Sequence, residues 1–173
     1  MLLALDIGNT EVTVGLFLGQ ELRGHWRMTT TAERTPDEWA VAPEAFLVRA
    51  GHSPAEISAA CIASVAPAVT QGLVLAVRSA VTAHVGIIDP RAKLPLVLDV
   101  DEPFAVGADR IANVLGALAL HPGDSVVVDF GTATTFDCIS ARGEYLGGAI
   151  APGINISMEA LFRNAARLPR VEF

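Results

Sequence analysis

The sequence has few of the features that mark extracellular, membrane or nucleic-acid-binding proteins. It contains only two cysteines, Cys61 and Cys138, and without a CxxC spacing or a nearby histidine they predict neither a disulfide framework nor a zinc site. We expect both to be small, buried apolar residues. No run of basic residues offsets the net charge of −7, which opposes binding to a phosphate backbone. No apolar run reaches the length of a membrane span, and Asp6 interrupts the first one. We therefore expect a cytoplasmic protein that binds neither nucleic acid nor membrane.

Apolar residues are abundant: they make up 51% of the chain, against 18% charged residues. This balance excludes disorder driven by low hydrophobicity and high charge. The length of 173 residues suits one ordinary domain or two small ones. We expect a folded, globular protein.

The first half of the chain alternates between strand and helix patterns. Turn residues separate three strand-like runs, and a helix then begins at Thr35, where Pro36 and Glu38 suggest a capping box. The order βββαβαβ follows from strands at residues 2–5, 12–18, 21–28, 57–65 and 85–88 and helices at residues 36–50 and 68–83.

The pattern then starts again. A helix is expected at residues 108–120. A new strand near residues 125–129 then leads into Asp-x-Gly, which repeats the layout of residues 3–9. Two βββα-starting units of this kind resemble the α/β, ribonuclease H-like fold of actin-type ATPases. We predict a first domain at residues 1–122 and the start of a second at 123–173, incomplete because it stops after its first helix, at 154–166.

The first chemical motif is Asp6-Ile7-Gly8-Asn9-Thr10. Gly8 allows close approach to a ligand, the turn can offer N–H groups to an anion, and Asn9 and Thr10 add side-chain donors. Asp6 could hold magnesium. An ordinary hairpin turn explains the same residues.

The second motif, residues 129–135, places Asp129 and three threonines around Gly131. Such a loop suits phosphate oxygens and a cation, although threonine is also common in plain hairpins. The match between this loop and the first one, each at the start of a repeat, favours the functional interpretation.

The third motif, Gly107-Ala108-Asp109-Arg110, opens a helix. A helix N-terminus attracts anions, Arg110 can bind a carboxylate or phosphate, and Asp109 could accept a proton from a hydroxyl. Asp109 could instead be a helix cap.

The series DIGNT, GADR, DFGTATT and GGAIAPG, in this order and spacing, resembles type III pantothenate kinase over essentially the whole chain. The resemblance implies ATP-dependent phosphorylation of the 4'-hydroxyl of pantothenate, the first step toward coenzyme A. It also implies a homodimer, with GGAIAPG near its interface, and a need for Mg²⁺ and for K⁺ or NH₄⁺.

The resemblance also implies roles for individual residues. Asp109 would be the general base and Asp129 a ligand of the monovalent cation. Pantothenate would be held by Gly107, Ala108, Asp109 and Arg110. ATP and its magnesium would be held by Asp6, Gly8, Asn9, Thr10, Gly131, Thr132 and Thr134.

Two other functions remain open from the sequence. A truncated, kinase-like module could bind ligands without catalysis, and another small-molecule kinase of the same superfamily would share the paired Asp-x-Gly loops. The incomplete second unit would have buried apolar strand edges near residues 144–152, and because an exposed edge must be covered, we also predict a dimer or higher assembly that uses residues 147–173.

Overall fold

The computed structural model describes residues 1–81 and 84–165, which fold into two compact units. The first unit contains residues 1–92 and 107–112, and the second contains residues 93–106 and continues from Asn113. The predicted domain division after residue 122 stays a prediction. In the described part of the chain, no helix is both long and apolar enough to cross a membrane.

The first unit is built on a five-stranded sheet in the order β3-β2-β1-β4-β5. Strands β1 to β3 are antiparallel neighbours, whereas β4 and β5 run parallel to β1. The strands are β1 (Leu2–Ile7), β2 (Glu11–Leu18), β3 (Glu21–Thr29), β4 (Ala59–Ser64) and β5 (His84–Ile87). The predicted order βββαβαβ is confirmed. Strand β4 begins two residues later than predicted, because Ser53 caps a short 3-10 helix at Pro54–Glu56.

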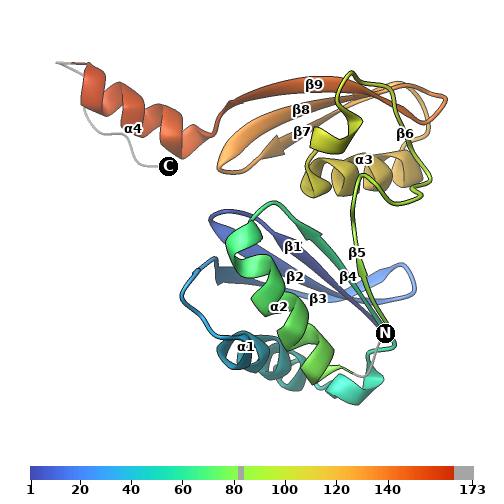
Figure 1. Cartoon of the computed structure of the whole chain (residues 1–173), viewed down its shortest axis with the longest axis vertical. Helices are drawn as coiled ribbons and strands as arrows, with labels where there is room; N and C mark the ends of the chain where they lie inside the picture. The colour runs from blue at the N-terminus through green and yellow to red at the C-terminus, as the bar shows by residue number, and fades with distance from the viewer. Residues whose placement is uncertain (82–83, 166–173) are drawn as a thin grey trace. The chain divides into compact units, whose positions relative to one another are not determined.

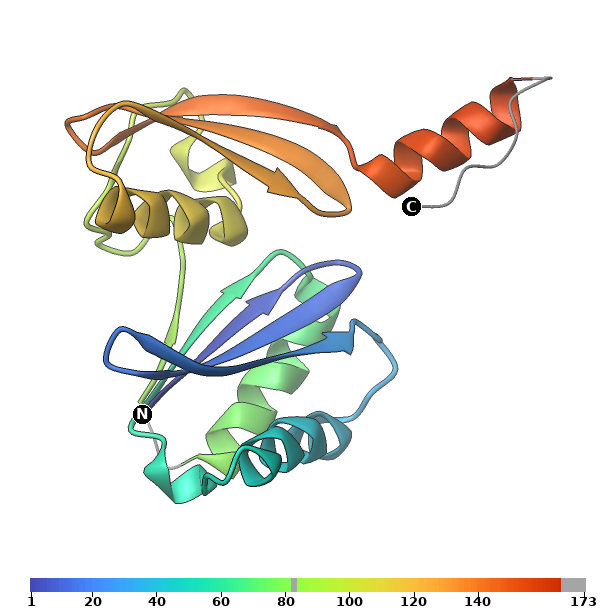
Figure 2. The same cartoon turned by 180° about the vertical axis from the view of Figure 1, so that it is seen from behind.

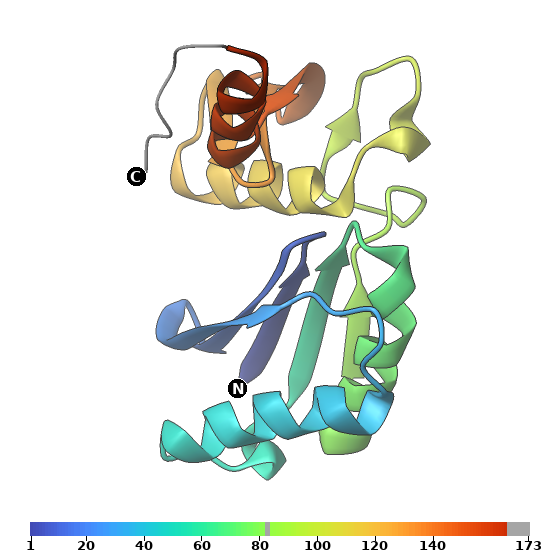
Figure 3. The same cartoon turned by 90° about the vertical axis from the view of Figure 1, so that its left-hand side faces the viewer.

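Helices α1 (Pro36–Arg49) and α2 (Pro67–Ala80) pack on the apolar face of this sheet (Figures 1 and 3). The predicted capping box is confirmed, since the side chains of Thr35 and Glu38 each bond to the other residue's backbone N–H. Helix α2 was predicted to reach residue 83, but its last helical residue is Ala80, and residues 82–83 lie outside the described part.

The second unit has a four-stranded sheet in the order β6-β9-β8-β7, with β6 (Val97–Leu98), β7 (Ser125–Phe130), β8 (Ala133–Ile139) and β9 (Glu144–Pro152). Helix α3 (Ala108–Leu120) begins in the first unit, and its later residues Val114, Ala117 and Leu118 pack in the core of the second. Helix α4 (Ile154–Asn164) buries no residue and extends past the end of the sheet (Figures 1 and 2). Ala166, its predicted last residue, lies outside the described part.

The first three strands of each unit repeat one another closely. From the first residue of the second strand, six residue pairs join β2 to β3 and six join β8 to β9 before the register shifts at a β-bulge. The residue opposite the sixth position is Gly24 in the first unit and Gly147 in the second. The internal repeat inferred from the sequence therefore extends to the position of an irregularity that the sequence did not predict.

Two details differ from the sequence-based expectations. Only Glu144 and Tyr145 of β9 pair with β6, and Leu146 and Ile150 are exposed rather than part of a buried edge. Cys61 and Cys138 are both unpaired, as expected, but they are half-buried rather than buried.

Candidate functional site

The DIGNT loop connects β1 to β2 at the end of the first unit's sheet. The Gly8 N–H donates to the Glu11 carbonyl at 3.0 Å, and a Cβ at Gly8 would lie 3.0 Å from that same oxygen. The turn is therefore too tight for most side chains at this position. Asp6, Asn9 and Thr10 are exposed around the turn. Carboxylate, amide and hydroxyl groups are thus accessible at one strand end.

Thr30, directly after β3, holds the same loop, and the sequence analysis missed it. Its hydroxyl donates to the Gly8 carbonyl at 2.7 Å, and its N–H donates to the Thr10 carbonyl at 3.0 Å. The available signal was a run of three threonines at the predicted strand end, Thr29 to Thr31. A single residue thus bonds two carbonyls of the candidate phosphate loop.

The GADR motif forms the first turn of α3. The Asp109 carboxylate accepts a 2.7 Å hydrogen bond from the Arg110 N–H, and Asp109 and Arg110 are both half-buried. A Cβ at Gly107 would collide with Asp109 Oδ1 and would lie 3.3 Å from Val65 Cγ1. Only glycine leaves room at position 107 for this placement of the Asp109 carboxylate. The bond also satisfies a backbone N–H in the first turn of the helix. Asp109 therefore stabilises the start of α3 in addition to any role in catalysis.

The DIGNT loop and the GADR turn lie at the same edge of the first unit. Strands β1 and β4 are parallel, so their carboxyl ends meet there, and the Val65 N–H after β4 donates to the Ile7 carbonyl at 3.0 Å. Val65 is in turn the neighbour of Gly107. Ligands of α/β proteins bind outside the carboxyl ends of such strands, and the structure brings two of the three predicted motifs there.

The DFGTATT loop lies between β7 and β8 in the second unit. The Asn113 side chain on α3 donates to Asp129 Oδ2 at 2.8 Å, and the Gly131 N–H donates to the Ala133 carbonyl at 2.9 Å. Thr132 is exposed, whereas Thr134 is only 8% exposed. The sequence analysis missed Asn113, although an amide one turn after Asp109 in an apolar helix was a possible signal. The carboxylate of Asp129 is thus held in place by an identified partner.

Asp137 is a third polar residue that the sequence analysis missed. It is fully buried, and its Oδ1 accepts a 3.0 Å hydrogen bond from the Tyr145 hydroxyl, while Oδ2 lies 3.5 Å from the Thr135 hydroxyl. A buried carboxylate is expensive unless it is hydrogen-bonded. These partners make Asp137 a structural link between β8 and β9.

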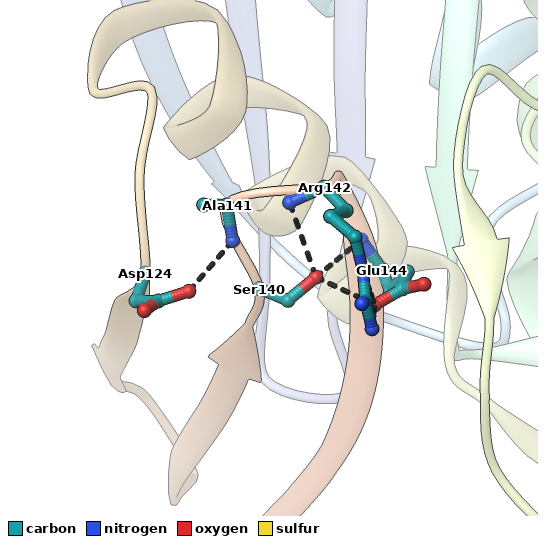
Figure 4. Close-up of polar contacts among 5 residues, drawn as sticks. All are labelled: Asp124, Ser140, Ala141, Arg142 and Glu144. Carbon is teal, nitrogen blue, oxygen red and sulfur yellow. Dashed lines mark hydrogen bonds and ion pairs between the residues drawn. The ribbon is translucent and has the colours of Figure 1, made fainter.

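The clearest pKa shifts in the second unit occur at the opposite end of β8, away from the DFGTATT loop. At the β8–β9 turn (Figure 4), the Arg142 guanidinium and then the Ser140 hydroxyl hold the pKa of Glu144 below its ordinary value. The same Glu144 carboxylate raises the pKa of Arg142. The Asp124 carboxylate accepts from the Ala141 N–H at 2.7 Å. These bonds close the turn and give it no catalytic feature.

Oxygen atoms dominate both candidate loops, which suits hard cations such as Mg²⁺ and K⁺. Among residues 1–81 and 84–165, no group of three or more His, Cys, Asp or Glu side chains is arranged to hold a metal ion. A cation at either loop would therefore depend on one carboxylate together with hydroxyl, carbonyl or phosphate oxygens.

A family model and individual relatives match essentially the whole chain and point to the same family. A sequence model of the family described as type III pantothenate kinase matches residues 2–173. The type III pantothenate kinase of Myxococcus xanthus is 46% identical over all of this chain and 68% of its own length, and that of Moorella thermoacetica is 45% identical over 99% and 68%.

Solved structures are similar at the level of the fold. The Ppx/GppA phosphatase of Aquifex aeolicus has a TM-score of 0.54 at 15% identity, covering 99% of this chain and 57% of its own. The ethanolamine utilization protein EutJ of Carboxydothermus hydrogenoformans has a TM-score of 0.50 at 14% identity, covering 97% and 57%. The predicted fold class, that of the actin-like ATPases, is confirmed.

Proposed function

The chain belongs to the type III pantothenate kinase family, and we propose which of its side chains carry out the phosphoryl transfer from ATP to pantothenate. The family match confirms the resemblance inferred from the motifs and decides against a different small-molecule kinase of the superfamily. The product is 4'-phosphopantothenate, the first intermediate toward coenzyme A. Because ATP is the phosphoryl donor, we place the protein in the cytoplasm.

The observation that carries the assignment of roles is the position of the Asp109 carboxylate. It lies over Gly107, at the edge of the sheet where the DIGNT loop also ends, and it is only half-buried. The acceptor of the reaction is a primary alcohol, which keeps its proton at neutral pH. Asp109 is the general base that takes this proton as the phosphoryl group arrives.

Neighbouring residues bind the substrate. Arg110 binds the carboxylate of pantothenate, because a guanidinium pairs with a carboxylate through two hydrogen bonds. Gly107 and Ala108 shape the backbone beside it. A helix N-terminus adds favourable electrostatics for an anionic substrate.

The two glycine loops hold the phosphates of ATP. Gly8, Asn9 and Thr10 supply donors from the first unit, and Gly131, Thr132 and Thr134 supply them from the second. Thr134 contributes through its backbone or by a local rearrangement, since its side chain is nearly buried.

The residues present also fit two cations. Asp6 would hold Mg²⁺, and Asp129, kept in place by Asn113, would hold K⁺ or NH₄⁺ together with threonine oxygens. Bound cations at these positions would offset phosphate charge in the transition state. Equal turnover in sodium and potassium buffers would contradict the monovalent site.

We also propose a homodimer that uses the GGAIAPG segment. Ile150 is 66% exposed in this segment, which supports an interface there. Residues 166–173, part of the predicted interface, lie outside the described part. A monomer in sedimentation at micromolar concentration would contradict this proposal.

The test is ADP release from ATP with pantothenate, Mg²⁺ and K⁺, compared with sugars and acetate as acceptors. Asp109→Asn keeps the shape of the side chain but removes the base, so turnover should fall by about 10²–10⁴-fold with little change in pantothenate affinity. Arg110→Ala should instead raise the KM for pantothenate and change that for ATP much less.

Turnover by Asp109→Asn above about a tenth of the wild-type value would reassign Asp109 to helix stabilisation, given the range expected of a general base. Pantothenate binding without any ADP release by the unmodified chain would favour the non-catalytic alternative.

A further inference from the structure

The residue that follows the third strand occupies the same place in both units. In the first unit, Glu11 pairs with Thr29, and Thr30 comes next. In the second unit, Ala133 pairs with Pro152, and Gly153 comes next. Thr30 and Gly153 are therefore equivalent positions of the internal repeat.

Both residues bond to the back of a glycine loop. The Thr30 N–H donates to the Thr10 carbonyl, and the Gly153 N–H donates to the Thr132 carbonyl, both at 3.0 Å. Each unit thus contains an equivalent hydrogen bond, from the residue after its third strand to its own glycine loop. Neither Thr30 nor Gly153 belongs to the motif residues assigned above to ligand binding.

The two units reinforce this bond in different ways. Thr30 adds its hydroxyl, which donates to the Gly8 carbonyl at 2.7 Å. Gly153 instead lets its backbone lie directly against the loop. It is buried, and a Cβ there would collide with the carbonyl oxygens of Gly131 and Thr132. A side chain reaches the loop in the first unit, and the lack of one allows the backbone to reach it in the second.

We propose that Thr30 and Gly153 are positioning residues that fix the orientation of the loop peptides toward the nucleotide phosphates. In a trans peptide the N–H of the next residue points opposite to the carbonyl. Holding the Gly8 carbonyl toward Thr30 turns the Asn9 N–H away from it, and holding the Thr132 carbonyl turns the Ala133 N–H away from Gly153. A backbone N–H that is turned outward in this way can contribute to an anion site in its own loop. The inference rests on the proposed phosphate-binding role of the two loops.

The first test replaces the Thr30 hydroxyl. Thr30→Val keeps the branched shape, Thr30→Ser keeps the hydroxyl, and Thr29→Val is a control on the exposed neighbouring position. Calorimetric titration with Mg·ADP should show about a 2- to 10-fold weaker Kd for Thr30→Val, the range expected for one lost hydrogen bond. Thr30→Ser and Thr29→Val should bind as the unmodified protein does. A merely structural role would not predict rescue by serine alone.

The second test adds a methyl group at the other loop. Gly153→Ala should weaken Mg·ADP binding by roughly tenfold or more, because the loop backbone must move to make room. Gly116→Ala is the control, since a Cβ at Gly116 meets nothing within 4 Å. Unchanged binding by both Thr30→Val and Gly153→Ala would overturn the proposal.

A protein that does not bind Mg·ADP at all would contradict the phosphate-binding function rather than the positioning role. Backbone amide NMR then decides the latter without any ligand. Thr30→Val should shift the Asn9 and Thr10 resonances while Thr30→Ser leaves them near their original positions, and resonances that do not move in Thr30→Val would overturn the inference.

Discussion

The first strands of the two units have equivalent sequences but very different surroundings. In β1, Leu3, Leu5 and Ile7 are 1%, 2% and 0% exposed. Their counterparts in β7 are Val126, Val128 and Phe130, in the same order, and these are 59%, 40% and 69% exposed. An alternating apolar pattern therefore does not by itself show whether the side chains of a strand are buried.

The difference arises from what packs on each sheet. Helices α1 and α2 cover the apolar face of β1, and β4 pairs with its second edge. Among the described residues of the second unit, β8 alone pairs with β7, and α4 extends past the sheet rather than across it (Figures 1 and 2). We call the side of this sheet that carries Val126, Val128, Phe130 and Phe136 the open face.

The largest expected effect is on stability, and it is measured at two equivalent positions, Leu5 in β1 and Val128 in β7. Leu5→Ala should lower the free energy of unfolding of the first unit by about 2–5 kcal/mol, because it leaves a cavity in a packed core. Val128→Ala should cost less than about 1 kcal/mol, because Val128 is already 40% exposed and its truncation leaves no enclosed cavity. Denaturant titration of both variants measures the two values.

The chain offers a separate optical probe for each unit. Both tryptophans, Trp26 and Trp39, lie in the first unit, and the single tyrosine, Tyr145, lies in the core of the second. Tryptophan fluorescence should follow Leu5→Ala, and near-ultraviolet tyrosine absorbance should follow Val128→Ala. Equal destabilisation by the two substitutions would mean that the open face is covered in solution.

An intermediate effect is expected on self-association. An unpaired strand edge beside exposed apolar side chains favours association between chains. Val126→Asp should weaken a concentration-dependent association by about tenfold or more, given the apolar area of one valine. Val48→Asp is the matched control, because Val48 is 66% exposed on α1 in the first unit. Sedimentation velocity that shows the same change for both variants would exclude the open face as the contact.

The smallest effect concerns the charged turn of the second unit. Arg142→Ala should raise the pKa of Glu144 toward its ordinary value of 4.5, because the guanidinium is the largest cause of the shift. A lowered pKa stabilises the fold above the unfolded-state pKa, and this contribution is lost as pH falls through the folded-state pKa. The variant should therefore be less stable than the unmodified protein above about pH 4.5, and the difference should disappear at lower pH, where Glu144 is protonated in both proteins.

Carboxyl NMR titration measures this pKa directly. Glu38 in the first unit is the internal control, since its pKa is lowered mainly by the Thr35 backbone N–H and should not change in Arg142→Ala. A parallel shift of Glu38 would indicate a global change instead of the loss of one local partner.

Local chemistry predicted much of the fold. The capping box at Thr35 and Glu38, the βββα repeat and the helix beginning at Ala108 depend on neighbours in sequence, and all three are present. Strand β6 was missed because two residues are too few for a pattern, and its pairing partner Glu144 lies far along the chain. Long-range pairing leaves little trace in a single sequence.

The candidate site was predictable in its motifs but not in its supports. Asn113 and Thr30 bond to Asp129 and Gly8 from other elements, so only the tertiary structure reveals them. The same applies to the Tyr145 hydroxyl that supports Asp137. The ligand-facing groups were inferred from residue types and resemblance, whereas their supports depend on which elements the fold places side by side.

The paired β-bulges also determine where the length of the chain can vary. A one-residue slip in a strand turns every side chain to the other face. An insertion or deletion between a bulge and its glycine loop would also put a different residue in place of Thr30 or Gly153. The turns at Gly19 and at Arg142 join the second and third strands on the other side of each bulge. A change of length there would alter neither the pairing of the six positions nor the residue at position 30 or 153. Related proteins should therefore gain or lose residues at these two turns and keep the six paired positions at constant length.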